Sequence, residues 1–364
     1  MAGFSRAALP DAFYDIQSSM LLAQPEPQFL YGAVFMAAMG ASLGVPIQLG
    51  LPGRTVGGAG ADYSREDRDR LILSSPLTTE LFAVKADFNA APGTTVKVNR
   101  PVFTDTTYTE ASRVIASGST ISTVPVAAPQ SEQNNITIQR FGGPYDQANS
   151  RVAPHAIEAF DANMGVFKAS TIIGSHLRRD FAKWLDAVHV TLFDKASTAV
   201  YPDGMTAVND ATATGSYPFT FEQLARAEQQ ADSSNLPTFS DGFRIAVLTP
   251  LQVKQLKDDP TYTRYAEFFK EYNLLFQGQY VGSVGKTHIF KSTTLNITNN
   301  SSSVPIHYGH YLVPGVLMGG MGRAPRVVPN TNDNYGETIL AVWLADLAFK
   351  LADARFVLSL RSSA

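Results

Sequence analysis

The sequence predicts an α+β fold with an extended N-terminal segment, a long β-hairpin, one long helix and a mixed region of strands and short helices. Apolar residues alternate with polar ones at 96–98 and again at 136–138, which is the period of a strand. Over 167–197, apolar residues recur every three or four positions, as on one face of a helix. After residue 216, short runs of both kinds follow one another.

The composition limits the classes of function. Charged residues make up 17% of the 364 residues, whereas ordinary soluble domains carry about 25%. This low fraction indicates that much of the surface meets protein rather than water. The 29 basic and 32 acidic residues give a net charge of -3, which argues against a dedicated nucleic-acid binder. The chain has no cysteine, which excludes disulfides, thiolate catalysis and cysteine-ligated zinc.

Residues 1–75 have the pattern of an extended arm. Prolines and a glycine cluster at 57–60 interrupt its short apolar runs, and no long amphipathic period is present. Such a segment cannot form a core of its own. The first residues also lack the basic start and apolar centre of a signal peptide.

The stretch Phe29–Leu49 needs a membrane check, because it carries no charge over 21 residues, about the length of a bilayer span. It is rich in Ala and Gly, Pro46 interrupts it, and no Lys or Arg lies close enough to anchor an orientation. These features favour an apolar arm, buried in a fold or an assembly, over a transmembrane helix.

Residues 76–148 predict a long hairpin with an irregular tip. A turn at Pro92-Gly93 precedes the alternation of Val96 and Val98, and a second alternating run follows after a polar stretch. A two-stranded ribbon alone is marginally stable in water. We therefore expect this ribbon to lie on another surface.

The 167–197 stretch predicts the longest helix, of roughly 31 residues and about 45 Å. Arg178, Arg179, Lys183 and Asp186 fall mainly off its apolar stripe. The stripe consists of Ile173, Leu177, Phe181, Leu185, Val188 and Leu192.

The region after the long helix predicts two shorter helices and a buried strand. Thr220 is a suitable N-cap for the first helix, and Gln223 lies where a capping box needs it. "FRIAVLTP" predicts a buried strand, and the second helix starts at Pro250 and stops at Pro260. "RYAEFFKEYNLL" is also predicted to be helical.

The rest of the chain predicts mainly strands. "THIFKST" is one strand, and "VPIHYGHYLVPGVLMGG" is predicted to form a strand pair. The last segment is ambiguous between helical and strand periods. Because "RFVLSLR" alternates cleanly, we predict two strands that meet around Ala352-Asp353.

Three short motifs resemble catalytic or nucleotide sites. Gly285-Lys286-Thr287 ends like a phosphate-binding loop, but Tyr280 stands where the first glycine is required, and a strand pattern follows instead of a helix. "GASLG" matches a nucleophile elbow with Ser42, although Pro46 disfavours the helix that must follow. Ser283 and Lys286 have the spacing of a Ser–Lys pair without its helical context.

The histidines do not form a recognisable metal site. His307 and His310 lie three residues apart and would face opposite sides of a strand. His176 and His189 lie beside the helix stripe, where a packed or solvated histidine is commoner than a ligand. Asp258-Asp259, Glu267 and Glu271 have the pattern of helix ends and solvated faces. We therefore predict no catalytic, cofactor-binding or metal residues, no cofactor and no enzyme activity.

Three stretches carry a resemblance to a known family. "FRIAVLTPLQVKQLKDDPTY" resembles a strand that ends in proline and leads into a short helix, "QGQYVGSVGKTHIFKSTTL" resembles the turn and strand that follow it, and "VKADFNAAPGTTVKVNRP" resembles the opening of an extended loop. With the order of elements, they make the chain similar to the major capsid proteins of tailed bacteriophages, which have the Hong Kong 97-type fold.

This resemblance implies a domain organisation. Residues 1–75 would be the N-terminal arm and 76–148 the extended loop, a β-hairpin that lies on a neighbouring subunit. Residues 149–215 would form the peripheral domain with its spine helix, 216–322 the axial domain, and 323–364 the return strands of the peripheral domain.

The implied function is that of a structural subunit that self-assembles into the icosahedral head of a tailed double-stranded DNA bacteriophage. Its partners would be further copies in pentamers and hexamers, a portal, and scaffolding or decoration proteins, with weak non-specific contact to packaged DNA and none to a membrane. It would occur in the virion, and in the host cytoplasm before assembly. Some members crosslink a loop lysine, but nothing around Lys85 or Lys97 predicts this. The alternatives are a serine hydrolase using Ser42 and an encapsulin-type nanocompartment shell.

Overall fold

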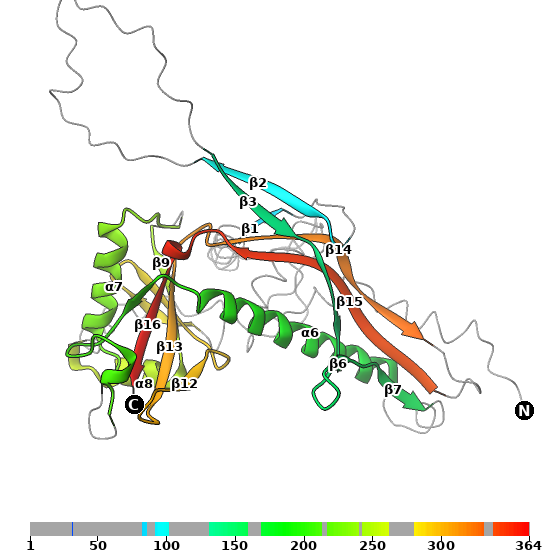
Figure 1. Cartoon of the computed structure of the whole chain (residues 1–364). Helices are drawn as coiled ribbons and strands as arrows, with labels where there is room; N and C mark the ends of the chain where they lie inside the picture. Colours follow the sequence, from blue (N-terminus) through cyan, green and yellow to red (C-terminus); the bar gives the residue numbers. More distant parts are fainter. Residues whose placement is uncertain are drawn as a thin grey trace, which may run out of the picture.

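Two β-sheets and one long helix organise the part of the chain that the structure describes. This computed structural model describes residues 31, 82–85, 92–101, 131–158, 169–212, 217–239, 242–261, 280–330 and 338–363. A five-stranded sheet runs along helix α6, Ala169–Phe193, and a seven-stranded sheet lies at the C-terminal end of this helix (Figure 1). The long strands of the first sheet extend away from the second.

The five-stranded sheet is built around a long antiparallel pair, β14 and β15. Its order is β1-β14-β15-β4, and β7 pairs with the beginning of β15. The register of β14 against β15 shifts between Met321 and Arg323 and again between Arg323 and Arg326. The strands are β1 (Phe82–Lys85), β4 (Gln139–Gly143), β7 (His155–Glu158), β14 (Leu317–Asn330) and β15 (Thr338–Leu351).

The seven-stranded sheet has the order β10-β11-β9-β13-β16-β8, with β12 paired to β13. Helices α7 (Phe221–Ser233) and α8 (Pro250–Asp258) pack on one of its faces, where Leu224 and Leu256 join a core with Leu248. Short 3-10 turns occur at Val208–Asp210 and Ala354–Phe356. The strands are β8 (Thr198–Val200), β9 (Arg244–Leu248), β10 (Tyr280–Val284), β11 (Thr287–Lys291), β12 (Ile297–Asn299), β13 (Pro305–Leu312) and β16 (Val357–Ser363).

Helix α6 covers one face of the five-stranded sheet. Side chains alternate between the two faces of a strand, and Trp343, Ala345 and Leu347 of β15 all point into the core that α6 lines. The ring of Phe181 meets Trp343 edge to face, with centroids 4.9 Å apart. At Gly143, β4 comes so close that an added Cβ would lie 2.5 Å from Nε1 of Trp343.

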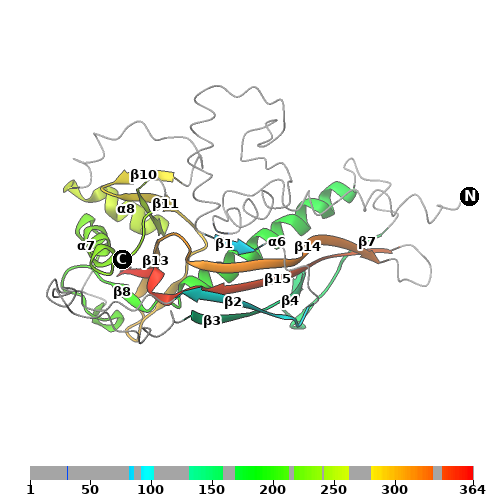
Figure 2. The same ribbon diagram turned by 90° about the horizontal axis from the view of Figure 1, so that it is seen from above.

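The predicted ribbon lies on the opposite face of this sheet. Strands β2 (Thr95–Pro101) and β3 (Ser131–Thr137) pair antiparallel, and both views place them across β14 and β15 from α6 (Figures 1 and 2). Ile136 and Ile138 are buried against Ala348 and Met318. The expectation that the ribbon lies on another surface is confirmed, and the surface includes the sheet of its own chain. A small hairpin, β5 (Tyr145–Asp146) and β6 (Arg151–Val152), follows β4.

Several sequence predictions agree with the structure. The long helix is confirmed over Ala169–Phe193, and it ends before the predicted residue 197. Strand β9 is buried at every residue, and α8 begins at Pro250 behind a capping box of Thr249 and Gln252. The last segment forms two strands, β15 and β16, as predicted. The predicted helix "RYAEFFKEYNLL" lies outside the described residues.

Two local predictions were wrong. Asp186 is buried rather than off the packed side of α6, because it accepts hydrogen bonds from Tyr31 and Thr294. Thr220 caps α7 by accepting from the N–H of Gln223. The Gln223 side chain, however, does not complete a capping box, because its Nε2 donates to the carbonyl oxygens of Val200 and Arg361.

The boundaries between the two sheets along the chain differ from the predicted domain boundaries. β13 and β14, predicted as one strand pair, belong to different sheets. β16 lies inside the seven-stranded sheet, between β13 and β8, so the 323–364 range is shared between the two sheets. β4, from the predicted loop range 76–148, belongs to the five-stranded sheet. The assignment of peripheral and axial roles stays a prediction.

Candidate functional site

The Gly-Lys-Thr motif forms a hairpin turn. Val284 of β10 pairs with Thr287 of β11, so Gly285 and Lys286 are the two residues between the strands. Gly285 has a φ of +56°, which glycine adopts at little cost and which two-residue hairpins require. The motif therefore launches strand β11, as the sequence predicted, and no helix N-terminus follows it to bind a phosphate.

The remaining catalytic motifs gain no support. Ser42, Glu267 and Glu271 lie outside the described residues. Ser283 is buried on β10 opposite His288, whereas Lys286 is exposed in the turn. Across the described ranges, no group of three or more His, Asp or Glu side chains lies together in a way that could hold a metal ion.

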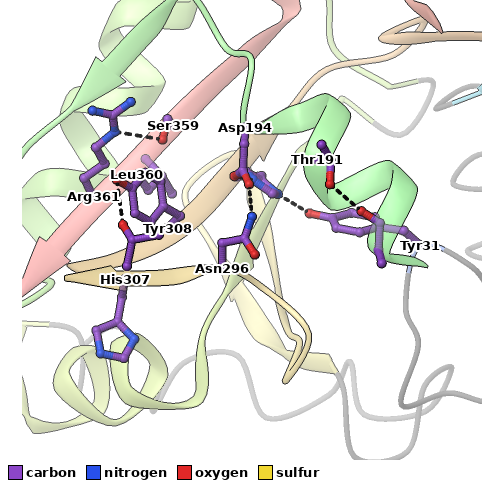
Figure 3. Close-up of polar contacts among 12 residues, drawn as sticks. Tyr31, Thr191, Asp194, Asn296, His307, Tyr308, Ser359, Leu360 and Arg361 are labelled. Carbon is purple, nitrogen blue, oxygen red and sulfur yellow. Dashed lines mark hydrogen bonds and ion pairs between the residues drawn. The ribbon is translucent and has the colours of Figure 1, made fainter. Parts of the chain in front are cut away.

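The strongest polar cluster lies where α6 meets the seven-stranded sheet. Tyr31 is almost fully buried here, and its ring packs edge to face on Phe193 with centroids 4.8 Å apart. Its backbone N–H donates to Asp186 at 2.7 Å. Tyr31, Asp194 and Asn296 converge at the end of α6 (Figure 3). Sequence reasoning missed this site, because Tyr31 has no local signal and its partner on α6 is 155 positions away.

A hydrogen-bonded chain runs through this junction. The oxygen of Tyr31 lies 2.7 Å from Nδ1 of His310, and Nε2 of His310 lies 2.9 Å from Oδ1 of Asp194. A carboxylate can only accept, so Nε2 of His310 carries a hydrogen, and in the neutral imidazole Tyr31 donates its O–H to Nδ1. Asn296 donates to the other oxygen of Asp194. The hydroxyl of Tyr31, both ring nitrogens of His310 and both oxygens of Asp194 therefore have partners.

The order hydroxyl, imidazole, carboxylate is also that of an activated nucleophile, but the environment here has the opposite effect. Burial first, and then the charges of Asp186 and Asp194, raise the pKa of Tyr31 well above its usual value. Its side chain is closed to solvent, so no substrate can reach the oxygen. The chain of hydrogen bonds instead joins Tyr31, helix α6 and strand β13 into one unit.

His307 and His310 point to opposite faces of β13, as predicted for a strand. His310 faces the junction. His307 lies against α8, with Nδ1 3.2 Å from the hydroxyl of Thr249. His189, on α6, is buried and donates from Nδ1 to the carbonyl oxygen of Leu185 at 2.6 Å, which is the packed histidine that the sequence favoured.

Comparison with solved structures identifies the fold. A capsid chain of cyanophage Pam1 matches with a TM-score of 0.56 at 12% identity, over 86% of this chain and 97% of that one. A capsid chain of Ralstonia phage GP4 matches with a TM-score of 0.54 at 12% identity, over 78% and 87%. A capsid chain of cyanophage P-SCSP1u matches with a TM-score of 0.53 at 15% identity, over 85% and 91%. The chain has the Hong Kong 97-type capsid fold. No family model and no curated protein matches the sequence.

In this capsid fold, the face of the five-stranded sheet that turns away from α6 carries three arginines. Arg140 of β4 and Arg323 of β14 flank Asp346 of β15 in one row, and Arg326 lies opposite Leu344 in the next. We call these residues, Arg140, Arg323, Arg326, Leu344 and Asp346, the arginine face. Arg140 binds the buried carboxylate with Nε at 2.8 Å and Nη2 at 3.3 Å.

A surface depression of about 380 Å³ lies between β8 and α7. Its only charged lining residue is Arg226, which is already paired with Asp203 at 3.0 Å and Glu222 at 2.6 Å. This depression therefore offers no unsatisfied charge to a ligand. None of the helices in the described ranges is long and apolar enough to cross a membrane.

Proposed function

We propose that this chain is the structural subunit of the icosahedral head of a tailed double-stranded DNA bacteriophage, and that it encloses and protects the genome. The observation that carries the proposal is the extent of the likeness: 78% to 86% of this chain superposes on 87% to 97% of three phage capsid chains. The likeness therefore extends over most of this chain and most of each capsid chain.

The physical properties of the chain support the same function. Only 17% of its residues are charged, as suits a surface that is largely covered by protein. The ribbon β2–β3 lies over only part of one face of the five-stranded sheet (Figure 2), and Ile136 and Ile138 are its buried apolar contacts there. A chain with no cysteine gains nothing from disulfides, so burial of apolar surface between copies, at about 25 cal/mol per Å², would provide much of the stability.

The proposed partners follow from this role. Copies of the chain would meet as pentamers and hexamers, with the 216–322 region near the five-fold and six-fold positions and the 76–148 region reaching a neighbour. A portal would occupy one vertex, and scaffolding or decoration proteins would bind the shell. Contact with packaged DNA would be weak and independent of sequence, because the net charge is only -3. Before assembly the subunit would be in the host cytoplasm.

The test is the assembly state of the purified full-length chain. We expect sedimentation and negative-stain microscopy to find closed shells, or rings of five and six copies. A stable monomer under every assembly condition, including molecular crowding and the presence of scaffolding protein, would contradict the proposal. No enzyme activity is proposed. If a fluorophosphonate probe labelled the wild-type chain but not Ser42→Ala, the proposal of a non-enzymatic role would be contradicted.

A further inference from the structure

The arginine face holds more positive charge than its one carboxylate can neutralise. Arg140 occupies both oxygens of Asp346, whereas Nε of Arg323 is 3.9 Å from the nearer one, beyond hydrogen-bond distance. Arg326 makes no hydrogen bond or ion pair within the described part of the chain and is exposed. Three positive charges less one negative charge leave the face at +2.

The guanidinium groups of this face remain open to a ligand. The side chain of Arg323 is 53% exposed and that of Arg140 45% exposed, whereas Asp346 is 3% exposed. Asp346 thus lies under the arginines and fixes Arg140, and the outward surface is positive. A guanidinium presents a planar fork of donors that matches a carboxylate, so this surface can bind further acidic groups.

Apolar side chains lie between the charges. Leu344 and Val342 of β15 are half-buried on the same face. Val152 of the β5–β6 hairpin is 46% exposed and lies next to Gly142, the strand partner of Leu344: a Cβ added at Gly142 would be 3.5 Å from the Val152 side chain. Arginine is enriched in protein–protein interfaces, and the fully buried centre of such an interface is more apolar than its rim. The ribbon already covers the adjoining part of this face with Ile136 and Ile138.

We propose that the arginine face is a contact surface for a second copy of this chain, which brings carboxylate side chains to Arg323 and Arg326. The inference rests on the proposed function, because a shell brings many copies together. Charge complementarity selects the partner. The whole chain carries -3, and subtracting the +2 of the face leaves -5 on the rest, so the remainder of a second copy is acidic. Double-stranded DNA is the less favourable partner, because that same acidic remainder repels a polyanion.

The experiment compares variants of the full-length chain by light scattering and sedimentation. Arg323→Glu/Arg326→Glu reverses the open charges and leaves the Arg140–Asp346 pair in place. We expect its critical concentration for assembly to rise tenfold or more, because like charges would then face each other. Lys183→Glu/Lys195→Glu, two exposed lysines on and just after α6, makes the same change in net charge and should shift the critical concentration less than about threefold.

Three further measurements distinguish a specific contact at the arginine face from a general effect of net charge. Arg326→Gln removes an exposed charge that makes no hydrogen bond or ion pair with the described residues, so it should keep the wild-type unfolding midpoint and still weaken assembly. In wild type, raising NaCl from about 0.05 to 0.5 M should weaken assembly by screening the contact, and this salt dependence should be smaller in Arg326→Gln. If both lysine and arginine variants weaken assembly equally, net charge is responsible and the inference is wrong.

The outcomes separate this inference from the proposed function. If wild type never assembles, the proposed function fails. If wild type assembles and the arginine variants match it at every salt concentration, only the arginine-face contact fails. If the arginine variants assemble normally but lose salt-dependent binding to a DNA duplex, the face binds DNA and the second-copy assignment is overturned.

Discussion

Tyr31 connects separate parts of the fold through both its backbone and its side chain. Its N–H donates to the buried carboxylate of Asp186 on α6, and its hydroxyl reaches His310 on β13. Since Asp194 near the end of α6 binds the same histidine, the three residues close a loop of contacts between helix and sheet. One tyrosine thereby fixes where the seven-stranded sheet meets the long helix.

Removing the hydroxyl in Tyr31→Phe should destabilise the protein by about 1–3 kcal/mol, because Nδ1 of His310 would remain buried without a partner. Urea unfolding of the full-length chain, followed by tryptophan fluorescence, measures this. Thr191→Ala is the matched control: it also deletes one hydroxyl near the end of α6, but from an exposed residue, and should change the free energy of unfolding by less than about 0.5 kcal/mol. Equal effects of the two substitutions would contradict the role given to Tyr31.

At the scale of elements, α6 carries a buried histidine that should make its packing depend on pH. Burial lowers the pKa of His189 to about 4, although the bond to Leu185 acts in the opposite direction. The unfolded chain binds this proton near pH 6.5 and the folded chain only near 4. Stability is therefore fully present above pH 6.5 and is lost as the pH falls toward 4, by an amount on the order of 3 kcal/mol.

His189→Gln removes this titration while it keeps a side chain that can donate to Leu185. The free energy of unfolding of wild type should fall more steeply than that of His189→Gln between pH 6.5 and 4.5. His176→Gln changes an exposed histidine of the same helix and should follow the wild-type curve. Parallel curves for wild type and His189→Gln would show that the helix does not depend on the neutral imidazole.

Elements with a strong local period could be predicted from the sequence. Helix α6 follows from its apolar stripe, and α8 from Pro250 and its cap. The sheet to which a strand belongs could not be predicted, because β13 and β14 adjoin in sequence and pair with distant partners. The arginine face could not be predicted either, because its residues come from β4, β14 and β15, which are distant in sequence. Two register shifts in β14 decide that both Arg323 and Arg326 share the face of Asp346, and no local pattern encodes them.

At the scale of the whole molecule, one core joins the two sheets. Buried residues of α6, β9, β13, β14 and β15 belong to a single cluster, and Tyr31 lies within it. A second cluster lies between the seven-stranded sheet and its two helices. The two sheets therefore do not behave as independent units, although the ribbon and the ends of β14 and β15 extend beyond the shared core (Figure 1).

If the chain is a shell subunit, its measured stability should depend on assembly. Scanning calorimetry of assembled particles should give an unfolding temperature higher than that of the dissociated chain at the same pH and salt, because only the folded chain binds its neighbours. A matched sample of Arg326→Gln, kept dissociated, should unfold at the temperature of dissociated wild type, because Arg326 is exposed. Identical unfolding temperatures for particles and free wild-type chain would mean that assembly contributes little to the stability of the fold.

The position of β16 in the seven-stranded sheet also sets the order in which this protein can fold during its synthesis. β8 has no other strand partner in the described part of the chain, and residues 201–356 must be made before β16 can pair with it. One edge of β13 also stays unpaired until β16 has been synthesised. Open strand edges attract wrong partners, and pairing between distant segments is slow. The nascent subunit therefore passes through a long interval in which its sheet is unfinished, and this interval is when a chaperone would have the greatest effect on the yield of native protein.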